Sequence, residues 1–187
     1  MFSLTHICFF ATVLLSAAVA EEATVPVTPT PVSTAEANVL PEKFYGYFEH
    51  DHDSDFNEYL YEKNYMYLAR KTIHWRTYIT IFMETDVKTE FTFAQSAWKT
   101  FLPVVYKNIT FGKTINGTGY DYRRQITFTL KDGHLFEHRV PLKGLDAQEE
   151  TFEYFFEGEF LVRRAFANGV VGRRFYKRIP VPVPEED

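Results

Sequence analysis

The last apolar run of the chain ends in two residues that could hold a carboxylate. Arg174 and Tyr176 lie two positions apart in the strand-like run 170–178. Successive side chains of a strand point to opposite faces, so these two share one face. A guanidinium offers a rigid fork of donors that matches a carboxylate, and a tyrosine adds a hydroxyl donor. The pair would clamp the acid head of a lipid if that face lines an apolar cavity; otherwise both are ordinary strand-surface residues.

The sequence offers little support for a metal site or a catalytic site. The acids of segment 50–55 fall at positions 1, 3 and 5 of a calcium loop, but Phe56 stands where such a loop needs glycine. His50 and His52 share a face of a predicted strand and could contact zinc, with an exposed acidic turn as the ordinary alternative. No serine-hydrolase elbow, zinc-protease motif or phosphate-binding loop is present. We therefore predict no enzymatic activity, no metal and no cofactor.

Composition is typical of one domain with a large aromatic interior. The chain has 187 residues, of which 45% are hydrophobic, and it contains 19 Phe and 12 Tyr. Large aromatic side chains bury much area, so the sequence can build a filled core or a lined cavity. The formal net charge of −5 argues against nucleic acid as a partner, since phosphate binding requires a basic face.

The start of the chain resembles a secretory signal peptide. Residues 7–18 form an apolar run and 18–20 read Ala-Val-Ala, a small-residue cleavage pattern. The run is shorter than the roughly 20 residues of a membrane span, which disfavours an anchor. We predict cleavage after residue 20 and a secreted protein. Cys8, the single cysteine, lies in this segment, so the mature domain has no disulfide and depends on its core.

The remainder divides into a folded domain between two tails. Residues 21–40 read as a disordered leader rich in Pro and Thr, residues 41–179 as the domain, and residues 180–187 as a tail of Pro and acids. Within the domain, residues 55–72 have helical spacing with a break near 63–64, and Ser54 or Asp55 is expected to cap the first helix, Asp55 as part of a capping box.

Ten short strands account for the rest of the domain. The runs with strand character are 44–50, 77–83, 89–93, 98–106, 107–111, 124–130, 134–140, 151–156, 160–166 and 170–178. Tight turns are expected at 131–133, 157–158 and 168–169. Strands in this order, with one helical pair after the first, predict a closed antiparallel barrel with a lid. Two glycosylation sequons occur, at Asn108, which is expected to point outward from a strand, and at Asn116, which is expected in a turn.

Four segments together resemble the fatty acid-binding protein family, and most closely its secreted nematode branch. They are the opening 41–48 (PEKFYGYF), the helix start 55–60 (DFNEYL), the hairpin 125–133 (QITFTLKDG) and the Arg-x-Tyr of 174–176. The resemblance extends over residues 41–178. It implies an all-β fold, a ten-stranded antiparallel up-and-down barrel capped by a helix-turn-helix lid. It also implies a monomeric, non-catalytic carrier that holds one long-chain fatty acid or a related lipid such as a retinoid.

The resemblance assigns the contact with the acid head to the Arg-x-Tyr pair. A second interior arginine of the family is missing, because its place holds Glu153 or Tyr154. Either one arginine forms the site or Arg163 or Arg164 on the neighbouring strand assists. The candidate ligand-binding residues are Arg174, Tyr176, Arg164, Phe128 and Tyr154.

Two further hypotheses concern the surface and the interior. Basic residues beside apolar ones in the helical pair suit transient contact with anionic membranes, although an ordinary amphipathic lid has the same pattern. These residues are Lys63, Tyr65, Met66, Tyr67, Leu68, Arg70 and Lys71. Alternatively, the protein is a structural component of an extracellular coat, whose barrel is filled by its own side chains. The proposed filling residues are Phe155, Phe160, Phe166 and Phe175.

Overall fold

The computed structural model describes residues 38–97, 103–118, 123–142 and 148–181. The predicted signal peptide, most of the predicted leader and residues 182–187 lie outside this part of the chain. The elements are the 3-10 helix η2 (Glu42–Phe44), the helices α1 (Phe56–Glu62) and α2 (Tyr67–Trp75), and the strands β1 (Gly46–Ser54), β2 (Ile79–Glu84), β3 (Phe91–Ser96), β4 (Val104–Ile109), β5 (Thr114–Thr118), β6 (Arg123–Lys131), β7 (His134–Pro141), β8 (Glu150–Glu157), β9 (Phe160–Ala167) and β10 (Val170–Ile179). None of the helices in these ranges combines the length and the apolar character that a membrane crossing requires.

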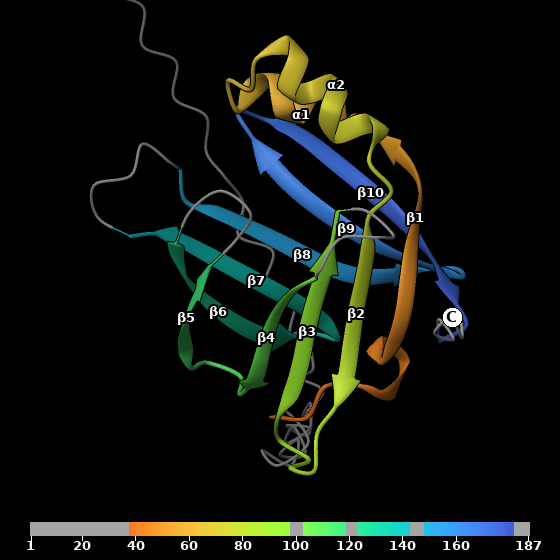
Figure 1. The fold of residues 1–187 in the computed structure, drawn as a ribbon, viewed down its shortest axis with the longest axis vertical. Helices are drawn as coiled ribbons and strands as arrows, with labels where there is room; N and C mark the ends of the chain where they lie inside the picture. The colour runs from red at the N-terminus through yellow and green to blue at the C-terminus, as the bar shows by residue number, and fades with distance from the viewer. Residues whose placement is uncertain (1–37, 98–102, 119–122, 143–147, 182–187) are drawn as a thin grey trace, which may run out of the picture. The chain divides into compact units, whose positions relative to one another are not determined.

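The strands form one antiparallel sheet that curls into a nearly closed barrel (Figure 1). Their order is β4-β3-β2-β1-β10-β9-β8-β7-β6-β5, so β1 pairs with β10 while β4 and β5 stand at the two edges. The hairpins turn where the sequence predicts; Asn168 and Gly169, for example, have φ of 47° and 83°, a backbone conformation that these two residue types adopt readily in two-residue hairpin loops. The predicted fold class, a ten-stranded barrel with a helical lid, is confirmed.

Three local predictions are wrong. Residues 107–111 do not form a separate strand, because 104–109 make the single strand β4. Asn116 lies in strand β5 and not in a turn, although its side chain is exposed, as that of Asn108 is. Asp55 occupies the cap position of α1, but its φ is 53° and no side-chain hydrogen bond caps the helix. The Ser54 hydroxyl donates to the Asp55 carboxylate instead (2.8 Å).

Aromatic rings fill the end of the barrel that lies away from the helices. The rings pack mostly edge-on or tilted, with centroids 5.1 to 6.4 Å apart, the geometry that favours aromatic pairs. They belong to Phe44, Phe48, Phe82, Phe91, Phe93, Phe128, Tyr154 and Phe156. Leu40, at the end of the predicted leader, is also buried in this core.

The four phenylalanines that the coat hypothesis placed inside the barrel do not fill it. Phe166 is 56% exposed, and Phe155 stacks on the half-exposed ring of His134. Phe160 and Phe175 pack around the ring of His52 on the outer face. That part of the prediction is wrong because each of these residues alternates with an inward neighbour.

The two helices lie over the opposite end of the barrel (Figure 1). Helix α1 buries Phe56, Tyr59 and Leu60, whereas α2 has no buried residue. The Tyr59 hydroxyl donates to Glu150 on β8 (3.3 Å). The first helix is therefore anchored by buried side chains, whereas the second is not.

Helix α1 rests directly on β10 at Gly172. A Cβ at this position would lie 2.6 Å from the Cβ of Tyr59 and 3.2 Å from the ring of Phe56. Any side chain here would displace the helix, since two carbons cannot approach so closely. The glycine is thus required by the close contact and not by its backbone angles.

We expect Gly172→Ala to lift α1 and loosen the lid. Overpacking of a tight contact costs about 1–3 kcal/mol, measurable as a lower free energy of unfolding in urea. Amide exchange in α1 should accelerate more than exchange in β6 and β7. Thr129→Ala, on an exposed position of β6, is the control. Unchanged stability and exchange in Gly172→Ala would show that the helix does not depend on this contact.

Candidate ligand-binding site

A cavity of about 250 Å³ lies beneath the lid. Apolar and aromatic side chains from both helices and from the strands form much of its wall, among them Phe56, Leu60, Ile73 and Phe152. The wall also carries five arginines, which are Arg76, Arg124, Arg139, Arg163 and Arg174. Glu150 is the one carboxylate among the lining residues that the structure describes. The cavity is therefore suited to an amphiphile with an anionic group.

The volume is slightly below that of ordinary ligand pockets, which span about 300–1,000 Å³. Aromatic rings pack the far end of the barrel, and the cavity lies at the end beneath the lid. A long chain consequently requires some wall side chains to move outward, whereas a short one does not.

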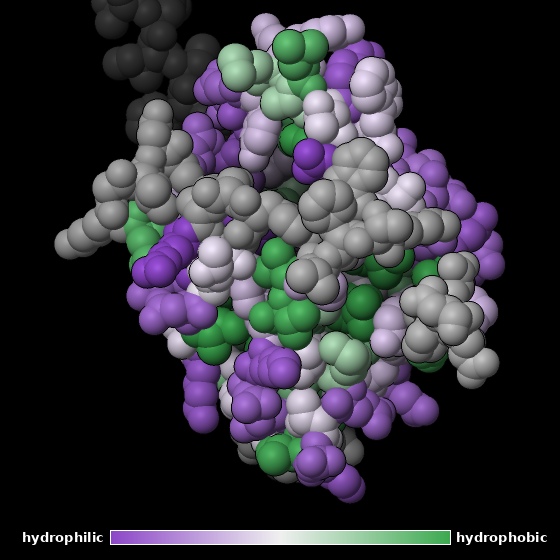
Figure 2. Space-filling view, in the orientation of Figure 1, coloured by the Kyte–Doolittle hydropathy of each residue, from purple (hydrophilic) through white to green (hydrophobic). Residues whose placement is uncertain are grey.

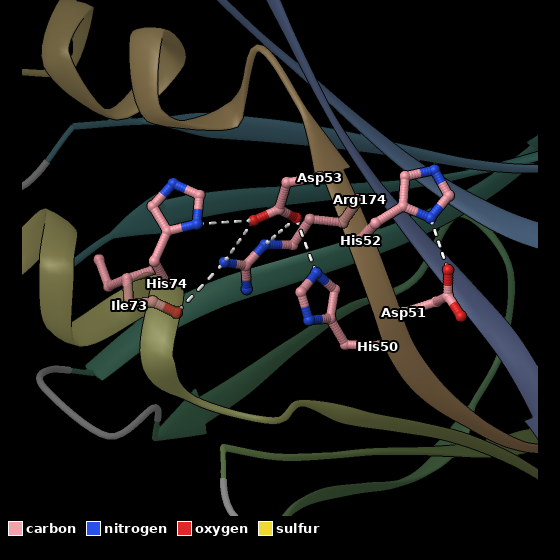
Figure 3. Close-up of polar contacts among 7 residues, drawn as sticks. All are labelled: His50, Asp51, His52, Asp53, Ile73, His74 and Arg174. Carbon is pink, nitrogen blue, oxygen red and sulfur yellow. Dashed lines mark hydrogen bonds and ion pairs between the residues drawn. The ribbon is translucent and has the colours of Figure 1, made fainter.

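Arg174 is 1% exposed, and two of its three guanidinium nitrogens contact protein oxygens (Figure 3). Its Nε lies 3.2 Å from Oδ1 of Asp53 and its Nη2 lies 3.5 Å from Oδ2. Nη2 also donates to the carbonyl of Ile73 at 3.3 Å. The guanidinium carbon lies 4.0 Å from the ring centre of Phe56 and 4.3 Å from that of Tyr78. Arg174 thus joins β10 to β1, α1 and α2.

A β-bulge places Asp53 against Arg174. The pairing of β1 with β10 runs His50–Tyr176, then His52–Phe175 and Asp53–Arg174, with a register shift between His50 and His52. The extra residue reverses the faces beyond it, so Asp53 points inward and His52 outward. Figure 3 accordingly shows the two histidines on opposite sides of β1. The prediction that His50 and His52 share a face is wrong for this reason.

Asp53 is the centre of a buried polar cluster (Figure 3). Its carboxylate lies 2.8 Å from Nε2 of His50 and 3.2 Å from Nδ1 of His74 on α2. Burial acts to raise the pKa of the Asp53 carboxyl, but the hydrogen bond from His50 and the charge of Arg174 hold that pKa below its usual value. The carboxylate is therefore charged at neutral pH and neutralises Arg174.

A second carboxylate, Glu137, neutralises Arg139. Glu137 is fully buried and accepts a hydrogen bond from Nε of Arg139 (2.6 Å) and from the hydroxyl of Tyr154 (2.8 Å). Burial acts to lower the pKa of Arg139, but the Glu137 charge holds it above its usual value. Burial and Glu137 together raise the pKa of the Tyr154 hydroxyl, although nearby Arg163 opposes them. Tyr154 therefore remains a neutral donor.

Arg163 lies between these two pairs. On the sheet it is directly opposite Arg174 of β10 on one side and Tyr154 of β8 on the other. It is 6% exposed, and its guanidinium carbon lies 3.6 Å from the ring centre of Phe152. Its Nε has no hydrogen-bond partner among the described residues.

Comparison with known proteins agrees with this architecture. No family model matches the chain. The chain is 50% identical over 150 residues to fatty acid-binding protein homolog 1 of Caenorhabditis elegans, spanning 80% of this chain and 93% of the relative. It is 44% identical over 145 residues to homolog 2 of the same organism, spanning 77% and 89%. This chain belongs to the fatty acid-binding protein family.

Solved structures of the family have the same barrel. As-p18, an extracellular fatty acid binding protein, is 27% identical, with a TM-score of 0.69 over 75% of this chain and 99% of that one. Lipid binding protein 8 of Caenorhabditis elegans is 20% identical, with a TM-score of 0.60 over 75% and 99%, and shares the fold.

The structure separates the residues that the family resemblance had grouped as a ligand site. Arg174 lines the cavity, and Tyr176 is buried on the same face of β10, as predicted. Phe128 and Tyr154 are interior, but neither is part of the cavity wall. Arg164 does not reach the cavity. It lies on the outer face, where its Nε donates to Glu153 (2.7 Å), and its assignment as a ligand residue is corrected.

Sequence reasoning missed the interior carboxylates and most of the interior arginines. Glu137 and Arg139 alternate with Leu135 on β7 and could have been assigned to its inner face by period-2 spacing. Asp53 could not, because the bulge that turns it inward leaves no mark in the hydrophobic pattern.

We expect Asp53→Asn to cost about 3 kcal/mol at pH 7, because it leaves Arg174 buried without a counter-charge. The folded pKa of Asp53 is lowered, so its contribution is present above the unfolded carboxyl pKa of about 3.9 and is lost as the pH falls through the folded value. The difference in free energy of unfolding between wild type and variant should therefore shrink between about pH 5 and pH 3.

Urea unfolding at several pH values measures this difference. Asp51→Asn is the matched control, because Asp51 is exposed and pairs with Lys177 on the outer face. A difference for Asp53→Asn that is as large at pH 3 as at pH 7 would contradict the assigned ion pair.

Proposed function

We propose that this member of the family is a carrier that binds one long-chain fatty acid, or a related lipid such as a retinoid, inside the barrel. The observation that supports this proposal is the cavity beneath the lid, whose described wall residues combine apolar side chains with five arginines and one carboxylate. A neutral lipid could bury its tail against the same wall but would gain nothing from the arginines. The coat hypothesis is less well supported, since its four filling residues do not fill the barrel and a cavity of about 250 Å³ lies beneath the lid.

Burial of the tail supplies most of the binding free energy. Each buried CH₂ contributes roughly 0.8 kcal/mol, so a tail of about sixteen carbons offers on the order of 12 kcal/mol before ordering costs. Micromolar affinity requires about 8 kcal/mol. The head contributes less, because removing a carboxylate and a guanidinium from water offsets much of their attraction. The arginines therefore select the head group, and the apolar wall sets the affinity.

We also propose that the carrier is a secreted, monomeric glycoprotein. The apolar run and small-residue site of residues 1–20 support export. Both sequon asparagines, Asn108 and Asn116, have exposed side chains that an oligosaccharide transferase can reach. As-p18, which is extracellular, is a structural neighbour.

One experiment on the full chain tests ligand binding and secretion together. Expressed in eukaryotic cells, the protein should appear in the medium, begin after residue 20 and lose mass on glycosidase treatment. Its extracted lipid should contain fatty acid by mass spectrometry, and a fluorescent fatty acid should bind one to one with at least micromolar affinity. A protein that stays in the cells and still begins at Met1 would contradict secretion. The absence of both extracted lipid and saturable binding would contradict the carrier function.

The outer face of the lid supports a third proposal, transient contact with anionic membranes. Leu68 and Trp75 of α2 are 76% and 80% exposed, and Met66 precedes them. Figure 2 shows apolar surface among polar residues at the helical end of the molecule. Arg70 and Lys71 stand on the same helix. Exposed apolar side chains beside cations suit the interface of an acidic bilayer.

We expect transfer of a fluorescent fatty acid to be faster into vesicles with phosphatidylglycerol than into phosphatidylcholine vesicles, and to slow at high salt, which screens the attraction. Leu68→Ser should slow transfer into the acidic vesicles without changing the affinity for the fatty acid. Val87→Ser is the control, since Val87 is half-exposed in the β2–β3 connection, away from the lid. Rates indifferent to salt, lipid charge and Leu68→Ser would reject membrane contact.

A further inference from the structure

We infer that Arg163 on β9, and not Arg174 on β10, contacts the carboxylate of the bound fatty acid. This inference rests on the proposed carrier function and specifies the group in the cavity that recognises the acid head. It differs from the expectation based on the Arg-x-Tyr pair, which stays a prediction until the two arginines are compared directly.

Arg174 already has a carboxylate in contact. Asp53 approaches two of its nitrogens, at 3.2 and 3.5 Å, and the carbonyl of Ile73 accepts from one of them. The rings of Phe56 and Tyr78 lie 4.0 and 4.3 Å from the guanidinium carbon. A ligand carboxylate here would have to displace Asp53 or lie beside it, and two like charges in one buried site disfavour each other strongly.

Arg163 has no carboxylate in contact among the residues that the structure describes. The neighbouring acids are engaged elsewhere, Asp53 with Arg174 and Glu137 with Arg139 and Tyr154. Within the described residues, its guanidinium instead lies over the rings of Phe152 and Tyr154. A guanidinium is always charged in proteins. Burial acts to lower the pKa of Arg163, and the charge of Glu137 helps to raise it, but Glu137 is bound to Arg139 and Tyr154. Arg163 is therefore buried without a carboxylate in contact among the described residues, which is unfavourable. An entering carboxylate would provide that contact.

Tyr176 is not among the described residues of the cavity wall, but it offers a buried hydroxyl donor next to Arg163. Its pairing partner is Leu161, whereas that of Arg174 is Arg163, so Tyr176 and Arg163 are diagonal neighbours on the inner face of adjacent strands. Tyr176 is fully buried, and its hydroxyl has no hydrogen-bond partner within the described ranges. The Nε of Arg163 is equally unpartnered. Both donors are therefore available to one carboxylate. The Nε of Arg174 makes no hydrogen bond among the described residues either, but it lies 3.2 Å from Oδ1 of Asp53 in an ion pair, so Arg174 differs from Arg163 in already having an anion in contact.

The test compares hexadecanoic acid with hexadecanol as competitors of a fluorescent fatty acid. Wild type should prefer the acid by about tenfold or more, since hydrogen bonds to a charged group contribute about 1.5–3 kcal/mol. Arg163→Met should reduce this preference to near unity while keeping the affinity for the alcohol. Arg163→Lys, which retains the charge but not the forked donor geometry of the guanidinium, should retain part of the preference for the acid. Arg164→Met, one position along on the outer face, is the matched control.

Arg174→Met is the competing variant. It should weaken acid and alcohol alike, because it loosens the lid, and leave their ratio unchanged. The inference is overturned if Arg174→Met abolishes the preference for the acid and Arg163→Met keeps it. Failure of wild type to bind either competitor would instead contradict the carrier function, whatever the role of Arg163.

A spectroscopic measurement covers the case in which Arg163→Met does not fold. Hexadecanoic acid labelled with ¹³C at the carboxyl, bound to wild type and to Arg163→Lys, is titrated with acid by NMR. The carboxyl bound to wild type should remain ionised to a lower pH than the one bound to Arg163→Lys, because the fork binds the anion with two hydrogen bonds. Identical titrations would overturn the inference.

Discussion

The distribution of carboxylates among the buried arginines governs the interior of this barrel. A guanidinium removed from water needs an anion or a ring, since effective desolvation costs several kcal/mol per ion. Asp53 is the counter-ion of Arg174, and Glu137 is the counter-ion of Arg139, each within hydrogen-bond or ion-pair distance. Arg163, between them on the sheet, contacts rings but no carboxylate within the part of the chain that the structure describes. The cavity thus has an excess of positive charge at a defined position. An apolar molecule with one acid group can pair with that charge while its apolar part packs against the cavity wall.

The two halves of the interior contribute differently to that arrangement. At the far end, rings such as Phe82, Phe93 and Phe128 interlock, and close packing of this kind fixes the strand register. Because register determines which side chains point inward, the filled half also determines where Arg163 lies. At the other end α2 buries no residue, so moving it exposes little apolar area. Ligand exchange is consequently easier beneath the helices than through the filled end.

The fold was largely predictable from the sequence because its local signals agree. Alternation in β6 to β10, the hairpin turns and the helical interruption after β1 all favour one barrel. The site was less predictable because it depends on which residues of each strand point inward. The bulge after His50 reverses the inward face of β1, and of the adjacent Arg163 and Arg164 only pairing with β10 decides which one faces the cavity. Strand β5 was missed because Asn116 and Gly117 resemble a turn, and cross-strand pairing with β6 overrides that preference.

Separation of the lid contacts from head-group recognition has an energetic consequence. Arg174 and Asp53 reach α2 through the carbonyl of Ile73 and the ring of His74, so they connect the lid to the wall. If Arg174 also held the ligand acid, every binding event would have to break or crowd a buried ion pair, at a cost of several kcal/mol. With the acid on Arg163, one strand away, that pair can persist while ligands enter and leave. The closing energy of the lid would then be similar for different head groups, and selection would depend on Arg163 of β9 and Tyr176 of β10 and not on the ion pair beneath the lid.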